Sequence, residues 1–572
     1  MTVVAGNTVD QLPSRRANTT PLISDALLMR IGVALLVAVL VLIIAMPLYA
    51  LLSKSFQNAN GQFVGLANYV RYFSTPALFN SIFNSLGVAL VTTAVVVPAA
   101  FVYAFALTRS MMPFKGLFYA LALLPIFAPS LLSAISLIYL FGTQGLLKEA
   151  LFGASIYGPI GITIAQILYC FPHAMIIMVA ALALADARLY EAAAALGTSK
   201  LRVFRTVTLP GAKFGLVNAS FVVFTLVVTD FGIAKVIGGQ FNVLATDAYK
   251  QVVGQQNFEM GAVVGMILLA PAVLAFFIDR VVQRRQVALL SARAVPLEPK
   301  RAATRDALLT AYCVIVGGLI AGILGVAIWA SFITYWPYNM ALTLNNYAFE
   351  TYDPSGWSSY FNSVAMAAGA AVFGTALVFF GAYLIEKTKV FGSGRFIAQL
   401  LAMLPMAVPG LVLGLGYVFF VNASWNPFNI FYGTLTVLVV NSIAHFYTVA
   451  HITSLTALKQ IDPEFESVSA SLQVPFWRTF GRVTVPISMP AILDIAVYMF
   501  VNALTTVSAV IFLYGADTKL ASVAIVHMDE AGATSAAAAM AALIVATALG
   551  VKLLHLALDR LLFARLQVWR RR

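Results

Sequence analysis

The chain has 572 residues, 61% of them hydrophobic and only 10% charged. Soluble globular domains carry about 25% charged residues, so this composition excludes an ordinary soluble globule. The formal net charge of +13 would suit a nucleic-acid partner only if the charge were gathered on a soluble domain, and no stretch of the sequence provides one. We therefore expect an all-α polytopic membrane protein that does not bind nucleic acid.

Apolar runs of spanning length recur along the whole chain. A helix needs about 20 apolar residues to cross a bilayer, because each residue adds about 1.5 Å. The first six runs lie near residues 31–52, 82–107, 117–141, 160–182, 214–237 and 261–277. The second six lie near residues 307–332, 364–385, 396–421, 432–455, 491–513 and 533–554. The sequence thus predicts about twelve transmembrane helices, with both termini on one side of the membrane.

A basic, proline-containing linker divides these runs into two groups of six. The predicted domains are an N-terminal segment (1–30), a first half (31–279, core about 80–279), the linker (280–306), a second half (307–558, core about 360–555) and a basic tail (559–572). The distribution of Lys and Arg orients the chain, because cytoplasmic loops retain positive charge. With a cytoplasmic N-terminus, six of the 35 Lys and Arg residues fall on or near the external side, and the remaining 29 (35 − 6) are cytoplasmic. We therefore expect both termini and the linker in the cytoplasm.

The two halves are an internal duplication in the same orientation, as six spans return the chain to its starting side. A shift of 276 residues places Asp186 on Asp462 and Pro210 on Pro486. Two further matches lie upstream, at similar shifts: LLPIFAP at 123–129 with MLPMAVP at 403–409, and Asn84-Ser85 with Asn362-Ser363. The prolines in the first of these motifs are expected to kink their spans.

The stretch 186–210, DARLYEAAAALGTSKLRVFRTVTLP, is polar and basic between two apolar runs. Each of its charges would cost at least ~2.5 kcal/mol in hydrocarbon, so it must lie in water against the membrane face. Gly197, followed by Thr198 and Ser199, is typical of a helix end and a new N-cap. Pro210 is suited to the start of the next span. The pattern predicts a helix, a sharp turn and a second helix.

This stretch resembles the EAA loop of type I ABC-importer permeases, in which E-A-A is followed by three residues, G, nine residues and I-x-L-P. The matching residues are Glu191, Ala192, Ala193, Gly197, Val207, Leu209 and Pro210. The resemblance covers most of the chain as two fused permease units and implies a bacterial inner-membrane location. It also implies that the loop forms a coupling helix on an ATP-binding subunit, with two copies of that subunit and a periplasmic solute-binding protein as partners.

The second copy departs from the pattern. Ser467 stands where the glutamate is expected, and Gln473 replaces the glycine. Glu466, one position earlier, is a candidate substitute for the missing carboxylate. We therefore predict unequal coupling by the loops at Glu191 and at Ser467.

Residues 229–265 resemble the corresponding region of fused permeases for ferric iron and for 2-aminoethylphosphonate, and are closer to the latter. The resemblance implies a small solute, with 2-aminoethylphosphonate favoured and ferric iron next. Within this region Asp230 lies in an apolar run, where an ionisable group is a candidate pathway residue. The competing interpretation is a local cap or a pair with Lys235.

No cofactor, metal site or catalytic centre is expected on this chain. It contains no G-x-x-x-x-G-K-S/T phosphate loop, so ATP hydrolysis would have to come from a separate subunit. Its five histidines are scattered without metal-ligand spacing. The main alternative function is an ion-coupled secondary transporter, which predicts several intramembrane carboxylates, or broken helices, at matched positions of the repeats. Asp230 has no acidic counterpart near residues 505–508, which weakens that alternative.

Overall fold

A computed structural model of the chain describes residues 25–183, 185–287, 295 and 297–563. Most of the predicted N-terminal segment, and parts of the linker and of the basic tail, lie outside these residues. The first half contains α1 (Asp25–Leu40), α2 (Met46–Ser55), α3 (Ala67–Phe73), α4 (Pro76–Arg109), α5 (Lys115–Leu123), α6 (Ser130–Phe141), α7 (Pro159–Ala183), α8 (Ala187–Ala195), α9 (Lys200–Val203), α10 (Leu209–Thr229), α11 (Gly232–Ile237), α12 (Leu244–Tyr249) and α13 (Phe258–Val287).

The second half follows a similar order and adds one short hairpin. It contains α14 (Ala303–Ala330), β1 (Ile333–Tyr335), β2 (Asn339–Leu342), α15 (Gly356–Gly369), α16 (Thr375–Glu386), α17 (Gly392–Met403), α18 (Gly410–Val421), α19 (Leu435–Lys459), α20 (Glu464–Ser471), α21 (Phe476–Thr479), α22 (Val485–Thr505), α23 (Ala521–Glu530) and α24 (Thr534–Leu558). Helices α3 and α11 have no α-helical counterpart in this half, and α15 with α16 correspond to α4. The two strands pair antiparallel, with Ile333 opposite Leu342 and Tyr335 opposite Asn339. The predicted all-α class is confirmed.

Ten helical segments of the described chain are long and apolar enough to cross a membrane, or up to twelve if each of two bent pairs is one span. The predicted number of about twelve is therefore confirmed. The bent pairs are Lys115–Phe127 with Ser130–Phe141, at 100°, and Gly392–Ala407 with Gly410–Val421, at 116°. The runs 117–141 and 396–421 are thus not straight helices.

Proline explains both bends. Pro129 and Pro409 have no amide hydrogen to donate, and each disfavours the helical conformation of the residue before it. Accordingly Ala128 and Val408 are extended, with ψ of 141° and 117°. The prolines expected to kink these spans therefore break them. The predicted run 214–237 is also broken, because α10 ends at Thr229 and the next residue is extended.

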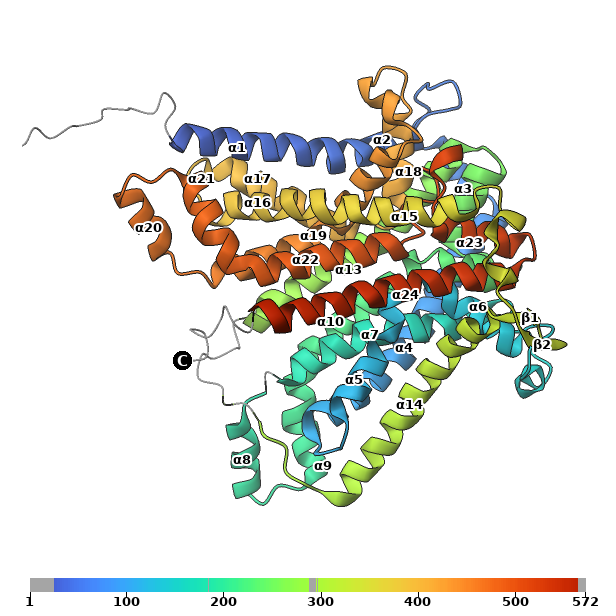
Figure 1. The fold of residues 1–572 in the computed structure, drawn as a ribbon, viewed down its shortest axis with the longest axis horizontal. Helices are drawn as coiled ribbons and strands as arrows, with labels where there is room; N and C mark the ends of the chain where they lie inside the picture. The colour runs from blue at the N-terminus through green and yellow to red at the C-terminus, as the bar shows by residue number, and fades with distance from the viewer. Residues whose placement is uncertain (1–24, 184, 288–294, 296, 564–572) are drawn as a thin grey trace, which may run out of the picture.

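The first span of each half packs against the other half. α1 lies along α16 and α17, and α2 lies against α18, whereas α14 lies against α4, α5 and α6. Figure 1 shows α1, in blue, beside the yellow and orange helices of the second half, and α14 across the blue and cyan helices of the first. This exchange ties the halves together through apolar burial as well as through the linker.

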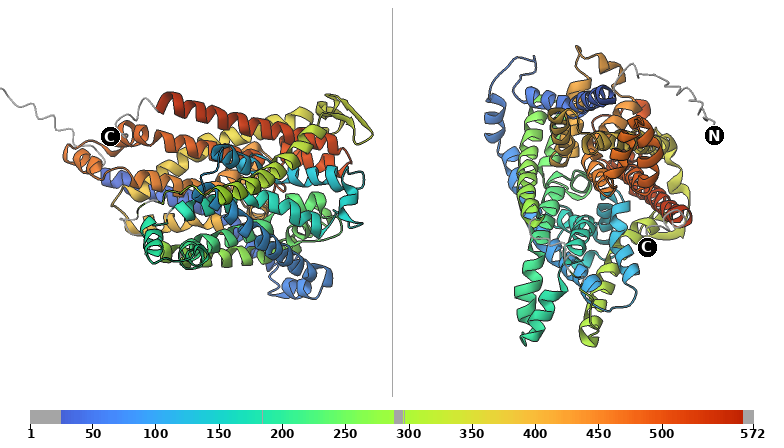
Figure 2. Two further views of the ribbon diagram at one scale, coloured as in Figure 1. Left: turned by 90° about the horizontal axis from the view of Figure 1, so that it is seen from below. Right: turned by 90° about the vertical axis from the view of Figure 1, so that its left-hand side faces the viewer.

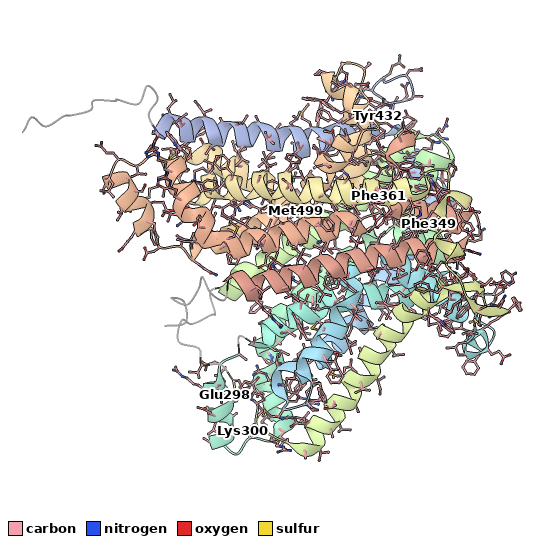
Figure 3. All side chains as sticks on the ribbon, viewed as in Figure 1. Glu298, Lys300, Phe349, Phe361, Tyr432 and Met499 are labelled. Atoms are coloured by element: carbon pink, nitrogen blue, oxygen red, sulfur yellow. The ribbon has the colours of Figure 1, made fainter. Side chains whose placement is uncertain are left out.

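The polar loops of both halves lie at one end of the molecule. α8 and α20 occupy the end that we call the loop end, and β1, β2, α3 and α23 occupy the opposite hairpin end (Figures 1 and 2). Apolar side chains both fill the interior and cover the outside (Figure 3). Met499 is fully buried among the helices of the second half, whereas Phe361 is 62% exposed, as expected for a side chain that faces lipid.

Gly416 allows the exchanged first span to approach closely. A Cβ at this position on α18 would lie 2.6 Å from the backbone oxygen of Pro47 on α2, and small residues are what permit such backbone contact between membrane helices. Gly416→Ala should therefore destabilise the protein by about 1–3 kcal/mol, because the helices must separate. Thermal unfolding in detergent measures this. Gly322→Ala is the control, since no atom lies within 4 Å of its added Cβ; equal effects of the two variants would contradict the prediction.

Candidate functional site

The first polar loop folds as a short helix with a defined start and end. Asp186 caps α8, since its Oδ1 accepts a hydrogen bond from the Arg188 amide at 3.1 Å. The helix ends at Gly197, whose φ of +64° is left-handed. This conformation lets the Thr198 amide bond to the oxygen of Ala193 at 3.0 Å, which is a Schellman ending. The helix start and stop predicted from the sequence are both present.

The second loop has the same geometry, although its sequence departs from the pattern. Asp462 Oδ1 accepts a hydrogen bond from the Glu464 amide at 2.9 Å. Gln473 adopts the left-handed conformation with φ of +55°, and the Val474 amide bonds to the oxygen of Ser469 at 2.9 Å. Replacement of the glycine has therefore not changed the turn.

Both loops also rejoin the membrane helices in the same way. A single π-helical turn follows each, at Phe204–Thr208 and at Phe480–Thr484. Pro210 and Pro486 are then the second residues of α10 and α22, where a missing amide hydrogen costs least. The local structure is thus duplicated from the cap to the proline.

Each short helix exposes apolar side chains on one face. On α8, Leu189 is 59% exposed and Leu196, just past its end, 82% exposed; their counterparts on α20, Phe465 and Leu472, are 47% and 70% exposed. The exposed residues Ala192 and Val468 lie between them at matched positions. Spacings of three and four residues put each set on one helix face. Exposed apolar faces on otherwise polar loops indicate an interaction surface.

The carboxylates of the two loops differ in their surroundings. Glu191 is exposed, and its carboxylate contacts no partner in the part of the chain that the structure describes. At the matched position, the hydroxyl of Ser467 donates to the oxygen of Pro463 at 3.2 Å. The Glu466 side chain is only 21% exposed and lies 3.4 Å from Lys387 Nζ. Glu466 therefore presents no free charge to solvent, and its role as a substitute for Glu191 stays a hypothesis.

A cavity of about 300 Å³ lies between the two halves. Both proline bends reach it, together with α7, α10, α19 and α22. None of its lining residues is Lys or Arg. Its polar lining includes Ser130, Tyr169, His173, Thr229 and Asp230 from the first half and His445, Tyr498, Asn502, Thr505 and Thr506 from the second.

Asp230 lines this cavity and also caps a helix. It is 8% exposed, and its Oδ2 accepts hydrogen bonds from Gln166 Nε2 at 3.0 Å and from the Ile233 amide at 2.9 Å. The expected pair with Lys235 is not formed, because Lys235 pairs with Glu530 on α23 of the other half. The two interpretations of Asp230, pathway residue and local cap, are therefore both compatible with its position.

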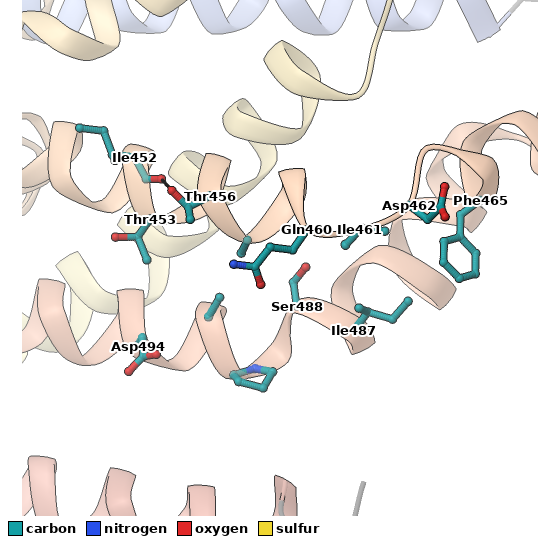
Figure 4. Close-up of a pocket in the computed structure, with 13 residues that line it drawn as sticks. Ile452, Thr453, Thr456, Gln460, Ile461, Asp462, Phe465, Ile487, Ser488 and Asp494 are labelled. Carbon is teal, nitrogen blue, oxygen red and sulfur yellow. Dashed lines mark hydrogen bonds between the residues drawn. The ribbon is translucent and has the colours of Figure 1, made fainter. Parts of the chain in front are cut away.

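A second pocket, of about 590 Å³, lies between α19 and α22 toward the loop end (Figure 4). Gln460 and Asp494 are among the polar residues that line it. The Asp494 side chain is 58% exposed, and its Oδ1 lies 3.4 Å from His555 Nε2. Because Asp494, Tyr498 and Asn502 follow at intervals of four, they share one face of α22. A polar strip thus runs along this face from the cavity toward the loop end.

The family described as the inner membrane component of binding-protein-dependent transport systems matches residues 97–287 and 378–564. These two matches cover more than half of the chain, one in each half. The chain belongs to this family. The permease is also similar to individual members of known name. The ferric transport system permease protein FbpB of Actinobacillus pleuropneumoniae is 28% identical over 82% of this chain and 69% of its own length.

Two further relatives differ in how much of the permease they cover. The putative ferric transport system permease protein FbpB 1 of Haemophilus influenzae is 29% identical over 77% of this chain and 70% of its own length. The putative 2-aminoethylphosphonate transport system permease protein PhnU of Salmonella paratyphi A is 25% identical over 46% of this chain and 96% of its own length. The first therefore resembles both halves, and the second corresponds to about one half.

Sequence analysis of the permease missed two residues that contact the loops. Arg109 and Lys387 are basic residues with buried side chains at the ends of α4 and α16, and each contacts the loop of its own half, at Tyr190 and at Glu466. In the sequence they are recognisable only as part of the positive charge on one side of the membrane. Each of them directly follows an apolar run, and they lie 278 residues apart (387 − 109). This matched position in the repeat is the sequence feature that could have identified them.

Gly197 and Gln473 have the same left-handed backbone conformation, so exchanging their residue types tests the cost of a side chain there. A non-glycine residue in this conformation costs about 1–2 kcal/mol, and a Cβ at Gly197 meets no atom within 4 Å, so the cost lies in the backbone alone. Gln473→Gly should make the end of α20 more stable, and Gly197→Gln should make the end of α8 less stable. Hydrogen exchange at the Val474 and Thr198 amides reports these local openings. Unchanged exchange in both variants would contradict the prediction.

Proposed function

We propose that this permease is the membrane subunit of an ATP-binding-cassette importer, in which α8 and α20 each dock one copy of an ATP-binding subunit. The observation that carries the proposal is the duplicated loop geometry at one end of the molecule, with an exposed apolar face on each short helix. Two equivalent docking helices suit two copies of one partner. The small side chains of Ala192 and Ala193 permit close approach, and Glu191 supplies a charge that fixes the register.

We place the loop end in the cytoplasm, together with both termini, in a bacterial inner membrane. The distribution of Lys and Arg supports this orientation. A periplasmic solute-binding protein would then deliver solute at the hairpin end, to the connections near residues 56–80, 241–257, 335–360 and 514–530. The third of these connections begins at the last residue of β1 and contains β2.

Transport would follow from movement of the two docking helices. Nucleotide-driven closure of the partner subunits moves α8 and α20 together, and the helices attached to them, α10 and α22, line the cavity between the halves. Closing the loop end while opening the hairpin end gives alternating access to that cavity. This chain supplies the passage and the docking surfaces, and not the hydrolysis.

For the solute we place ferric iron first and 2-aminoethylphosphonate second. The relatives that resemble both halves are named as ferric transport permeases, whereas the phosphonate permease corresponds to about one half. The cavity also suits a solute with a positive centre, since it contains Asp230 and neither Lys nor Arg. Both solutes have such a centre, the ferric ion itself or the ammonium group of the phosphonate.

Co-purification and uptake test the function together. The permease is expressed with its ATP-binding subunit, purified, and reconstituted with the binding protein and ATP. We expect the ATP-binding subunit to be retained and uptake to require both ATP and the binding protein. Loss of the subunit, with uptake driven by a proton or sodium gradient alone, would instead establish the ion-coupled secondary transporter. Labelled iron and labelled 2-aminoethylphosphonate, offered separately, decide between the solutes.

A further inference from the structure

Two buried basic residues occupy equivalent positions in the two halves. Arg109 is the last residue of α4, and Lys387 directly follows α16. The shift of 278 residues that relates them also relates Asn84 to Asn362, so they end the same span of the repeat. Arg109 is 6% exposed, and the Lys387 side chain is 8% exposed. Burial of a charged group at this level requires compensation by specific partners.

Each of these residues holds the end of the span that leads into its loop. Arg109 Nη2 donates a hydrogen bond to the oxygen of Leu182 on α7 at 2.6 Å. Lys387 Nζ donates to the oxygen of Ile461, just after α19, at 2.9 Å. The last carbonyls of a helix lack partners within the helix, so a basic side chain there is stabilising. This contact alone would be an ordinary helix cap.

Arg109 and Lys387 also each contact the docking helix of their own half, at the same position of the repeat. The guanidinium of Arg109 lies 5.3 Å from the ring centre of Tyr190 on α8, a cation–π contact. Lys387 Nζ lies 3.4 Å from Glu466 Oε2 on α20. Tyr190 and Glu466 are related by the 276-residue shift (466 − 190) of the loops. Each half therefore joins its docking helix to the neighbouring span at the same position of the repeat. The first half does so through a cation–π contact and the second through an ion pair.

We propose that Arg109 and Lys387 are positioning residues that join each docking helix to the end of its neighbouring membrane span, so that displacement of the helix by the ATP-binding subunit moves the spans. This inference rests on the proposed function. We call the two sets the Arg109 clamp (Arg109, Tyr190) and the Lys387 clamp (Lys387, Glu466).

The clamps explain why Glu466 is turned away from solvent. A carboxylate on a polar loop would normally face water, yet Glu466 packs against Lys387 and is only 21% exposed. Its counterpart Tyr190 likewise points to Arg109, and its hydroxyl donates to Thr208 Oγ1 at 3.1 Å. The position therefore faces inward in both halves, while Glu191 and Ser467, one residue later, are exposed.

The test separates a clamp from a simple helix cap. Tyr190→Ala and Glu466→Ala leave both carbonyl contacts in place and remove the link to the docking helix. Tyr190→Ala also removes the hydrogen bond to Thr208, a loss that Tyr190→Phe reproduces alone. For each we expect the ATP hydrolysed per solute transported to rise about threefold, in line with the effect of residues that carry coupling. Tyr190→Phe, which keeps the ring, should retain the wild-type ratio. The readouts are ATP hydrolysis and solute uptake in the same proteoliposomes, with thermal unfolding as the check on folding.

Exchange variants sharpen the test. Tyr190→Glu gives the Arg109 clamp the chemistry of the other half, and Glu466→Tyr does the reverse, so both should retain coupling better than the alanine variants. If Tyr190→Ala and Glu466→Ala keep the wild-type ratio, the clamp is refuted while the proposed function stands. If the wild-type permease retains no ATP-binding subunit, the proposed function fails and the clamp fails with it.

Discussion

Glu191→Ala should reduce binding-protein-stimulated ATP hydrolysis at least about tenfold, because truncating one member of a buried charge pair at an interface costs about 2–5 kcal/mol. The carboxylate is exposed and has no partner among the described residues, so it is free to pair with the ATP-binding subunit. ATP hydrolysis by the reconstituted complex, with and without solute-loaded binding protein, measures the effect.

The matched variant Ser467→Ala is the control for this prediction. The Ser467 hydroxyl already bonds to the oxygen of Pro463 within its own helix, so its loss should change stimulated hydrolysis less than twofold, in keeping with about 1 kcal/mol or less for such a bond. Glu191→Gln separates the charge from the side-chain shape and should resemble Glu191→Ala. Equal losses in Glu191→Ala and Ser467→Ala would refute unequal coupling by the two loops.

The internal repeat predicts the local structure of the second loop better than its residue types do. Gln473 is a poor choice for a left-handed turn, and Ser467 does not match the expected glutamate. Yet Asp462, like Asp186, accepts a hydrogen bond from the amide two residues later, and the amide after Gln473 bonds to the carbonyl that matches the partner of the amide after Gly197. The hydrogen bonds at the start and at the end of α20 together determine its backbone conformation, so the unfavourable Gln473 is tolerated.

Other features depend on tertiary contacts that no local pattern encodes. The division into two halves of six spans gives no sign that α1 and α14 pack against the opposite half, because an apolar helix is equally suited to either neighbour. The inward direction of Glu466 depends on the position of Lys387, 79 residues earlier. The same holds for Lys235, whose partner Glu530 lies in the other half.

Asp230→Asn should reduce solute uptake at least about tenfold while leaving the fold and the assembly intact. Asparagine keeps an oxygen that can accept the hydrogen bond of the Ile233 amide, but it removes the negative charge at the cavity. A hydrogen bond to a charged group contributes about 1.5–3 kcal/mol, which is the loss expected for a solute with a positive centre. Uptake under saturating binding protein and ATP is the measurement, with Thr506→Ala as the matched control, expected to change uptake less than twofold.

Asp230→Ala separates two roles of Asp230, its negative charge in the cavity and its hydrogen bond to the Ile233 amide at the start of α11. It leaves the Ile233 amide and the Gln166 side chain without their acceptor, and each unsatisfied buried donor costs about 1–3 kcal/mol, so this variant should also lower the thermal unfolding midpoint. If Asp230→Asn transports normally and only Asp230→Ala is impaired, then Asp230 serves α11 as a cap and has no role in the pathway. If Asp230→Asn unfolds at the wild-type temperature and fails to transport, the charge itself acts on the solute, and the asymmetry with Thr506 means that the first half provides the charged wall of the cavity.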